Sequence, residues 1–293
     1  DGHTAMLLGT AEALSKKAEK LNGTVKFFFQ PAEEGQGGAR FMIEDGALTN
    51  VDEVYGIHLW NYQKYGTVGV KPGPIMAAAD IFQINIHGKG GHGAAPQGTQ
   101  DAVLIAAHII QTLQTIVSRE LKLIDDAAVV TIGSIHGGNR SNIIPNEVEM
   151  VGTIRTLNHA AREHVYEAMA RKVKGIADSM GATAELTLPL DYNYPITFND
   201  PALTAKMLPT VERTAGKENT ILAKPVTGAE DFSFYQEQVP GLFMWLGGKP
   251  LDVPVADSPA HHTPEFYVDD SGMKLGVRVM ANLTLDYMAQ HGE

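Results

Sequence analysis

Hydrophobic and polar positions along the chain predict where its first helices and strands lie. Leu and Ala recur at steps of three or four residues over residues 4–21, which predicts a helix there. Continuous apolar runs at 24–29, 53–59 and 241–247 are typical of buried strands, and a helix is predicted over 36–45. Because strand, helix and strand follow one another, this part of the chain favours an α/β fold with parallel pairing.

The middle of the chain has a different pattern, in which one face of a strand is polar. Residues 81–87 alternate between apolar and polar side chains, as a half-buried strand does. Further elements are predicted as strands over 128–136, 147–156 and 183–190, and as long helices over 101–120 and 159–180. We therefore expect an α/β protein in which an α+β domain at 77–189 is inserted into a domain made of 1–76 and 190–293.

The composition is that of a folded, acidic protein. Of its 293 residues 44 % are hydrophobic and 19 % charged, which is enough apolar material for a sizeable core. The net charge is −11, and an acidic surface repels the phosphates of nucleic acid. No Cys is present, which excludes disulfides and a cysteine nucleophile. With no export signal and no apolar run near the ~20 residues that span a bilayer, we expect a cytoplasmic protein without a membrane partner.

Two adjacent carboxylates, Glu33 and Glu34, follow the apolar run at 24–29. Ligands of open α/β sheets bind beyond the carboxyl ends of the strands, which makes this pair a candidate site. Neighbouring side chains at a strand end point in opposite directions, so one glutamate could hold a metal while the other reaches the reacting atom. A solvated acidic turn would have the same short sequence.

Histidines are the other candidate metal ligands. His58 ends the apolar run at 53–59, and His261 and His262 lie near the C-terminus. Glutamate and histidine together suit Zn, Mn, Co or Ni. Each histidine also fits a structural role or an exposed loop, since candidates scattered in sequence do not by themselves define a cluster.

Residues 88–93 are a glycine-rich turn that formally matches GxGxxG. A dinucleotide site also needs an acidic residue that ends a second strand about 20 positions later. Position 113 is Leu, inside a predicted helix, so we expect the turn to present His92 instead. Arg155 ends a predicted strand, where it suits either a carboxylate ligand or a structural ion pair.

Eight short stretches occur together, in order, over nearly the whole chain. They are residues 1–9 (DGHTAMLLG), 30–35 (QPAEEG), 56–58 (GIH), 90–96 (GGHGAAP), 142–145 (NIIP), 152–155 (GTIR), 229–232 (AEDF) and 262–264 (HTP). With this ordered set the chain resembles the metal-dependent amidohydrolases of the aminoacylase and carboxypeptidase type. The nearest branch holds hippurate hydrolases, N-acyl-amino-acid amidohydrolases and plant auxin-conjugate hydrolases.

The resemblance implies a metallopeptidase-like catalytic domain at 1–76 and 190–293 and a lid or dimerisation domain at 77–189. It implies two divalent metal ions (Zn, Mn, Co or Ni) and hydrolysis of the amide bond of N-acyl amino acids or related small amides and peptides. The residues implied are Glu33 as general base on a metal-bound water; Glu34, His58 and His262 as metal ligands; His92 for the oxyanion, often from the partner chain of a homodimer; and Asn142 and Arg155 for the substrate carboxylate or the closed lid.

The chain departs from this branch at its first residue. The first metal motif of the branch reads Cys-Gly-His-Asp-Gly-His, with the Cys and the first His as ligands, and this chain begins at the Asp of that motif. We therefore expect that an N-terminal part with two ligands is missing. An alternative function is then a non-catalytic protein that binds acyl amino acids or dimerises on the same scaffold, because half of the metal site would be absent.

Overall fold

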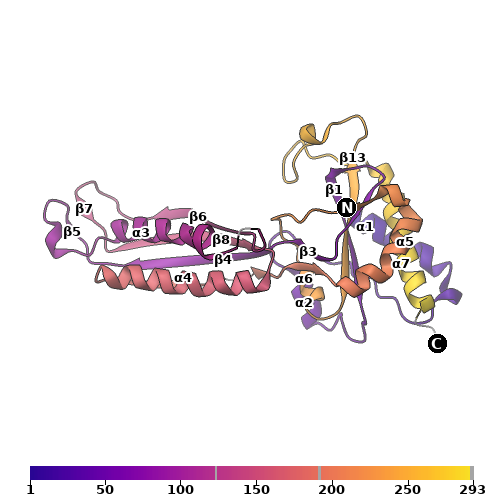
Figure 1. Cartoon of the computed structure of the whole chain (residues 1–293), viewed down its shortest axis with the longest axis horizontal. Coiled ribbons are helices and arrows are strands. Elements are labelled where there is room, and N and C mark those ends of the chain that lie inside the picture. The colour runs from indigo at the N-terminus through magenta and orange to yellow at the C-terminus, as the bar shows by residue number, and fades with distance from the viewer. Residues whose placement is uncertain (123, 191–192, 291–293) are drawn as a thin grey trace. The chain divides into compact units, whose positions relative to one another are not determined.

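The chain folds into two compact units (Figure 1). The computed structural model describes residues 1–122, 124–190 and 193–290. The first unit consists of Asp1–Ile75, Thr197–Pro225 and Asp231–Glu293, and the second of Met76–Ile196 and Val226–Glu230. The chain thus leaves the first unit twice and returns to it twice. The roles of catalytic domain and lid, assigned above to 1–76, 190–293 and 77–189, stay predictions.

The first unit is built on a mixed sheet with the strand order β1-β13-β2-β12. These strands are β1 (Val54–Lys64), β13 (Gly241–Lys249), β2 (Val68–Val70) and β12 (Thr220–Leu222). β1 runs parallel to β13, and β12 runs parallel to β2, whereas β13 and β2 are antiparallel. Every residue of β13 is buried, which is typical of a strand covered on both faces. A separate two-stranded pair is formed by β3 (Gly73–Met76) and β11 (Thr197–Asn199).

Three helices pack against this sheet, namely α1 (Gly2–Ser15), α5 (Pro201–Ala215) and α7 (Met273–Gln290). They share one buried core with the strands, to which Met6, Leu59, Met207, Leu246 and Val279 belong. Two short helices, α2 (Gly38–Glu44) and α6 (Ser233–Gln236), contact each other. The remaining short helices of this unit are η1 (Ala18–Lys20), η4 (Lys217–Asn219), η5 (Val255–Asp257) and η6 (Asp270–Gly272).

One predicted strand is absent from the first unit. Residues 24–29 pair with no strand in the part of the chain that the structure describes, so this prediction is wrong. Phe28 packs against Tyr235, with ring centroids 5.4 Å apart, whereas Phe29 is 49 % exposed. An apolar run indicates burial, but a strand also needs a neighbour for its backbone hydrogen bonds. The helix predicted over 4–21 ends early, at Ser15.

The second unit contains an antiparallel sheet with the strand order β10-β4-β8-β6, and β9 also pairs with β4. Its strands are β4 (Ala78–His87), β6 (Ala128–His136), β8 (Glu147–Thr156), β9 (Thr183–Thr187) and β10 (Asn193–Tyr194). The strands predicted over 128–136 and 147–156 are confirmed. Burial alternates strictly along β4, so Gln83, Asn85 and His87 lie on the less buried face, whereas Asp80 lies on the buried face with Phe82, Ile84 and Ile86.

Two helices cover the apolar face of this sheet, α3 (Ala102–Thr115), which continues into the short helix η3 (Ile116–Glu120), and α4 (His159–Ser179) (Figure 1). α3 begins at Asp101, whose carboxylate accepts hydrogen bonds from the N–H groups of Val103 (3.0 Å) and Leu104 (3.2 Å). The buried core between sheet and helices includes Phe82, Ile84, Ile86, Ile105, Ile109, Leu113, Met150, Val165, Met169 and Val173.

By length and composition alone, the helical stretch Ala102–Glu120 could cross a membrane, and no other helix among the described residues could. A single such helix is weak evidence, because a core helix of a soluble protein meets the same criterion. Here Ile105, Ile109 and Leu113 are buried in the core of the second unit. Cytoplasmic localisation stays a prediction.

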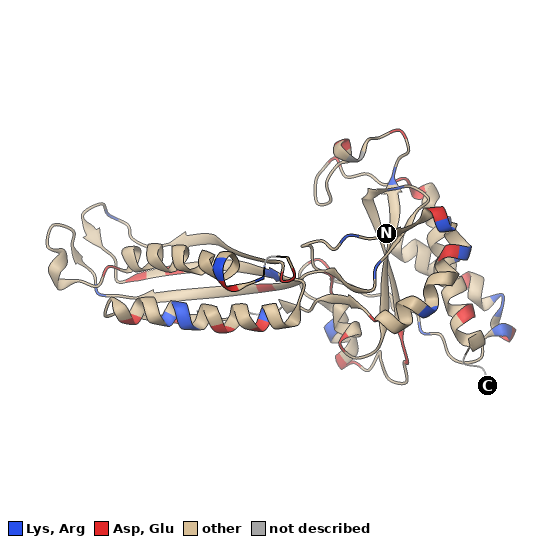
Figure 2. Cartoon of the chain, in the orientation of Figure 1, with Lys and Arg blue, Asp and Glu red and all other residues tan. Residues whose placement is uncertain are grey.

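A buried ion pair joins β4 to α4 in the second unit. Figure 2 shows Lys and Arg interspersed with Asp and Glu on the helices, and most such pairs are exposed. The Asp80 side chain, in contrast, is fully buried. The Arg162 guanidinium donates to both of its oxygens, from Nη2 at 2.5 Å and from Nε at 3.0 Å. This two-point contact fixes the first turn of α4 over the sheet.

We expect Arg162→Met to lower the free energy of unfolding of the second unit by about 3–5 kcal/mol, because it leaves the Asp80 carboxylate buried without its cation. The matched control is Lys174→Met on the same helix. Lys174 pairs with Asp178 at the surface, where such a pair contributes at most about 1 kcal/mol. Urea unfolding followed by circular dichroism measures both variants, and similar small losses in the two would contradict this assignment.

Candidate active site

The four site residues predicted in the first unit lie near one another. The imidazole Nδ1 of His262 lies 3.8 Å from a carboxylate oxygen of Glu34. His58 is close enough to both of these side chains for each to shift its pKa, and Glu34 likewise shifts the pKa of Glu33. A carboxylate pair and two histidines from three distant parts of the chain thus form one cluster. Their individual roles stay predictions.

The turn that carries Glu33 and Glu34 is tight and needs glycine. Ala32 has a φ of 59° and Gly37 a φ of 68°, and the Gly37 N–H donates to the Ala32 carbonyl at 3.1 Å. Gly38 allows the closest approach, because a Cβ there would lie 1.8 Å from the Pro31 carbonyl oxygen. The glycines after the two glutamates therefore fold the chain back so that α2 starts directly beside them.

Asp231 holds both ends of this turn. Its carboxylate, buried to 1 % exposure, accepts hydrogen bonds from Gln30 Nε2 (2.8 and 2.7 Å) and from the Ala39 N–H (3.0 Å). Its backbone N–H also donates to Glu33, and carboxylate oxygens of Glu33 and Asp231 lie within 4.8 Å of each other. Asp231 is not among the site residues predicted above, although it lies in the matching stretch at 229–232.

The surroundings of Glu33 raise the pKa of its carboxyl group. Partial burial, the neighbouring Glu34 and the Asp231 carboxylate together raise the pKa of Glu33 to about 7, against the lowering effect of the hydrogen bond from the Asp231 backbone. A carboxyl group with a pKa near neutral pH can both take up and release a proton under working conditions. Glu33 therefore fits proton transfer better than it fits a permanent charge.

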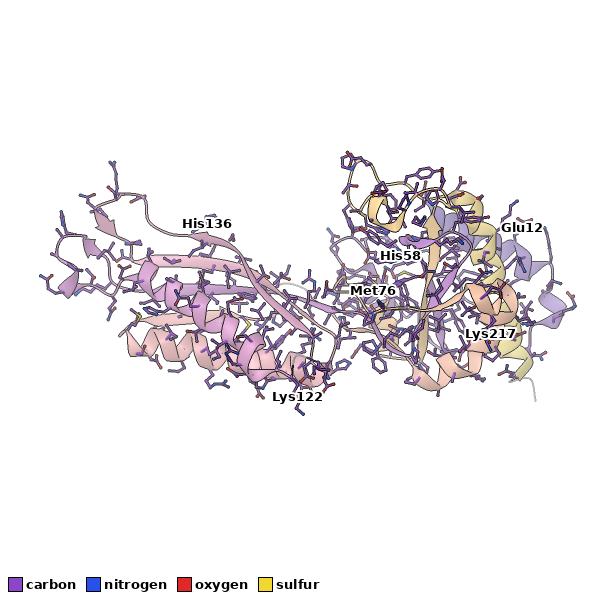
Figure 3. The ribbon with its side chains drawn as sticks, turned by 45° about the horizontal axis from the view of Figure 1, so that its top comes forward. Glu12, His58, Met76, Lys122, His136 and Lys217 are labelled. Atoms are coloured by element: carbon purple, nitrogen blue, oxygen red, sulfur yellow. The ribbon has the colours of Figure 1, made fainter. Side chains whose placement is uncertain are left out.

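His58, labelled in Figure 3, is oriented by its own strand. Its Nδ1 lies 2.6 Å from the carbonyl oxygen of Leu59. Because a carbonyl can only accept, Nδ1 must carry the hydrogen, and in the neutral ring the lone pair is then on Nε2. Burial lowers the pKa of His58, which favours the neutral ring. Neutral imidazole with one nitrogen bound to a backbone carbonyl is the form that ligates metals.

His261 and His262 are adjacent but differ in their surroundings. His261 lies among the rings of Trp60, Tyr62 and Phe266, with centroid distances of 4.8, 5.3 and 4.9 Å. Burial is the main cause that lowers the pKa of His261 to about 4. His262 is exposed and faces Glu34, with a φ of 62°. The preference for His262 over His261 as a ligand agrees with this difference but stays a prediction.

Buried polar contacts fix the loop that carries these histidines. Asn61 is fully buried on β1, and its side-chain Nδ2 donates to the Pro259 carbonyl. The backbone carbonyl of Asn61 accepts a hydrogen bond from Ser258 Oγ at 2.6 Å. Lys249, at the end of β13, donates from Nζ to the Pro250 carbonyl at 2.7 Å. Hydrogen bonds thus connect the loop to β1 and to β13, and they set the position of its histidines.

In the second unit, His92 and Asn142 lie side by side. His92 is the last residue of β5 (Gly91–His92) and pairs with Ile143 of β7 (Ile143–Ile144), which Asn142 directly precedes. The Gly93 N–H donates to the Asn142 carbonyl at 2.8 Å. The short helix η2 (Pro96–Gly98) follows. His92 Nδ1 accepts from the Ala94 N–H at 3.1 Å, so in the neutral ring Nε2 carries the hydrogen. His92 can therefore donate a hydrogen bond, as an oxyanion requires.

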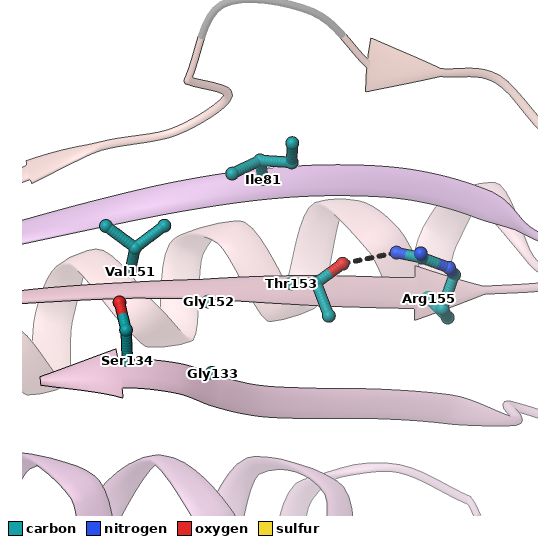
Figure 4. A pocket seen from close by; sticks show the side chains of 7 residues that line it. All are labelled: Ile81, Gly133, Ser134, Val151, Gly152, Thr153 and Arg155. Carbon is teal, nitrogen blue, oxygen red and sulfur yellow. Dashed lines mark hydrogen bonds between the residues drawn. The ribbon is translucent and has the colours of Figure 1, made fainter. Parts of the chain in front are cut away.

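Arg155 lies on β8 in the five-stranded sheet, whereas His92 belongs to the separate pair of β5 and β7. It lines an open groove with Ile81, Gly133, Ser134, Val151, Gly152 and Thr153 (Figure 4). Its guanidinium donates to Thr153 Oγ1 and to the Ile154 carbonyl, and burial lowers its pKa. In the register of β4 and β8, Arg155 faces Ala79 and Glu147 faces His87. The eight residue steps from Arg155 to Glu147 correspond to about 26 Å at ~3.3 Å per residue, and the chain reaches His92 only after it has passed His87, at the far end of these strands.

The donor set of the first unit fits divalent metal ions. Glu34 offers carboxylate oxygens, and His58 offers an Nε2 lone pair whose direction the Leu59 carbonyl fixes. His262 adds a second imidazole, and oxygen with imidazole nitrogen suits Zn, Mn, Co and Ni. Together with the α/β fold and the half-buried Glu33, this donor set fits the class of metal-dependent hydrolases.

The comparison with known proteins narrows this class. The sequence profile of peptidase family M20/M25/M40 matches residues 1–286. The chain is 38 % identical over 289 residues to Thermostable carboxypeptidase 2 of Saccharolobus solfataricus, and also to N-acetylcysteine deacetylase of Bacillus subtilis. These alignments cover 98 % and 97 % of this chain and 72 % of each relative. The chain therefore belongs to peptidase family M20/M25/M40.

A solved structure agrees with this assignment. The YXEP protein of Bacillus subtilis, described as a dinuclear metal-binding peptidase of the M20 family, matches with a TM-score of 0.81 and 34 % identity. The match covers 99 % of this chain and 72 % of that one. The resemblance to metal-dependent amidohydrolases and the mixed α/β fold class are thereby confirmed, and divalent metal use is supported.

We expect Gly38→Ala to destabilise the first unit by about 1–3 kcal/mol and to weaken Zn²⁺ binding, because the new Cβ forces the turn with Glu33 and Glu34 apart. Gly98→Ala is the matched control, since a Cβ there meets no atom within 4 Å. Thermal unfolding and Zn²⁺ titration calorimetry measure both effects. Unchanged stability and affinity in Gly38→Ala would contradict the described turn.

Proposed function

We propose that the protein hydrolyses the amide bond of N-acyl amino acids or related small amides and peptides. The observation that carries this proposal is Glu33, a half-buried carboxyl with its pKa raised to about 7, beside the Glu34 and histidine cluster. One relative is named a deacetylase of N-acetylcysteine and another a carboxypeptidase. Both names describe cleavage of an amide bond next to an amino acid, which supports this substrate class.

We assign the metal ligands of this chain as Glu34, His58 and His262, and expect two divalent ions, of Zn, Mn, Co or Ni. When bound, such ions lower the pKa of water and polarise the carbonyl that is attacked. The chain's own residues then carry the proton. Glu33 takes it from the attacking water and gives it to the leaving amine, as a group with a pKa near 7 can.

His92 and Arg155 are assigned to the two ends of the substrate. His92 would donate from Nε2 to the developing oxyanion, with Asn142 beside it, whereas Arg155 would bind a carboxylate. The two ends of the sheet are about 26 Å apart at ~3.3 Å per residue, which is longer than a small amide. One substrate therefore cannot contact both residues of one chain, which supports a homodimer in which His92 comes from a second copy.

Exposed groups of the second unit support this homodimer. β6 is the last strand in its sheet, and its outer edge pairs with no other strand among the described residues. Val103 and Leu104 on α3 are 47 % and 48 % exposed. A free strand edge beside exposed apolar side chains fits a second copy of the same chain. The partners proposed are thus this second copy and a small-molecule substrate.

We expect Glu33→Gln to lower kcat by about 10²–10⁴-fold while the metal content stays unchanged, because the amide cannot transfer the proton. Turnover is measured on N-benzoyl-glycine, N-acetyl amino acids and dipeptides, and metal content by mass spectrometry after desalting. Glu34→Ala is the companion variant and should lose bound metal. Retained turnover in Glu33→Gln would disprove its role as general base.

We expect the dimer to dissociate in Leu104→Glu, because a charge on the exposed face of α3 cannot be desolvated in an apolar interface. Light scattering behind a sizing column measures the mass of wild type and variant. Leu222→Glu, at a 75 % exposed position of β12 in the first unit, is the control and should leave the mass unchanged. A monomeric wild type at micromolar concentration would contradict the proposed assembly.

A further inference from the structure

Two imidazole rings bind the backbone of one residue at the outer edge of β1. β1 is the first strand in its sheet order, so among the described strands only β13 lies beside it. On its other edge, the N–H of Leu59 donates to His3 Nε2 at 2.8 Å. The carbonyl oxygen of Leu59 accepts a hydrogen bond from His58 Nδ1 at 2.6 Å. The rings of His3 and His58 are tilted against each other, with centroids 4.9 Å apart.

The chemistry of these two contacts fixes the hydrogens on both rings. A backbone N–H can only donate, so His3 Nε2 must carry a lone pair, and a neutral His3 then holds its hydrogen on Nδ1. A carbonyl can only accept, so His58 Nδ1 must carry a hydrogen, and the lone pair of its neutral ring is on Nε2. Because the N–H and C=O of one strand residue point to the same side, one ring cannot shift without disturbing the other.

We propose that His3 is a positioning residue, which fixes the orientation and tautomer of His58 by holding the Leu59 backbone at the strand edge. His58 is thereby kept with its Nε2 lone pair available to the cluster with Glu34 and His262. The consequence for metal binding rests on the function proposed above, whereas the effect on the His58 tautomer does not.

The start of α1 is built to keep His3 at this place. The Asp1 side chain caps the helix by accepting the Gly2 N–H at 2.7 Å. Gly2 then allows contact with β1, because a Cβ there would lie 2.6 Å from Leu59 Cδ1. The next residue along the helix is His3, and its ring reaches the Leu59 N–H from this close contact.

A packing role alone does not account for His3. The buried residues of α1 are Gly2, Met6, Thr10 and Leu14, which follow one another at steps of four. His3 lies outside this stripe, although burial lowers the pKa of its ring to about 3. Its hydrogen bond to the neighbour of His58 therefore distinguishes it from the residues that hold α1 on the sheet.

The test compares two variants of His3 in the full chain. His3→Phe keeps a flat ring but has no acceptor for the Leu59 N–H, whereas His3→Gln retains an acceptor in Oε1. Long-range ¹H–¹⁵N spectra of histidine-labelled protein without metal report the His58 tautomer, and Zn²⁺ titration reports affinity. His159→Phe, at the exposed start of α4, is the matched control.

We expect His3→Phe to reduce the Nδ1–H tautomer of His58 and to weaken Zn²⁺ binding by about 10–100-fold, with the urea midpoint close to wild type. His3→Gln should restore most of the affinity. An unchanged His58 tautomer in His3→Phe would overturn the proposal, and so would equal losses in the Phe and Gln variants. Absence of turnover in wild type would refute the proposed function instead, since the tautomer is read without substrate or metal.

Discussion

The parallel ladder between β1 and β13 is the constraint on which the arrangement of the first unit depends. In its register His58 faces Trp245, and the ladder continues to Trp60 facing Gly247. Both strands run in the same direction, so the chain leaves them at the same edge of the sheet, where α/β proteins place their ligands. The loop after β13 therefore starts beside β1, and its residues His261 and His262 lie near His58. The ladder thus brings His58 and His262, which are about 200 positions apart in the sequence, to the same edge of the sheet.

A second constraint sets the acidity of the site. The buried carboxylate of Asp231 accepts hydrogen bonds from Gln30 and Ala39, at the two ends of the turn at 31–38, and so holds the turn closed. Burial and Glu34 raise the pKa of Glu33, and Asp231 adds to this effect. The carboxylate that holds the turn closed thus also contributes to the electrostatics of Glu33.

The sequence predicted those features that depend on local pattern. Alternation over 81–87 located a strand that the structure extends to 78–87, a strand-like pattern located the one at 147–156, and an ordered motif set led to the correct family. The run at 24–29 was misjudged because an apolar sequence does not reveal whether a neighbouring strand is present. β2 and β12, of three residues each, are too short to form a recognisable period. The sequence therefore did not predict which strands pair, because strand pairing depends on segments that are distant in the chain.

The same distinction applies to the histidines of the site. A sequence can rank His58 by its place at the end of an apolar run, but it cannot tell which ring nitrogen keeps a lone pair. That choice follows from the Leu59 carbonyl at 2.6 Å, and the Leu59 N–H makes the converse choice for His3. Backbone groups that a strand leaves unpaired at its edge must find other partners. At Leu59 those partners are imidazoles, so the need to satisfy the backbone of this residue also directs the ring nitrogens of His58 and His3.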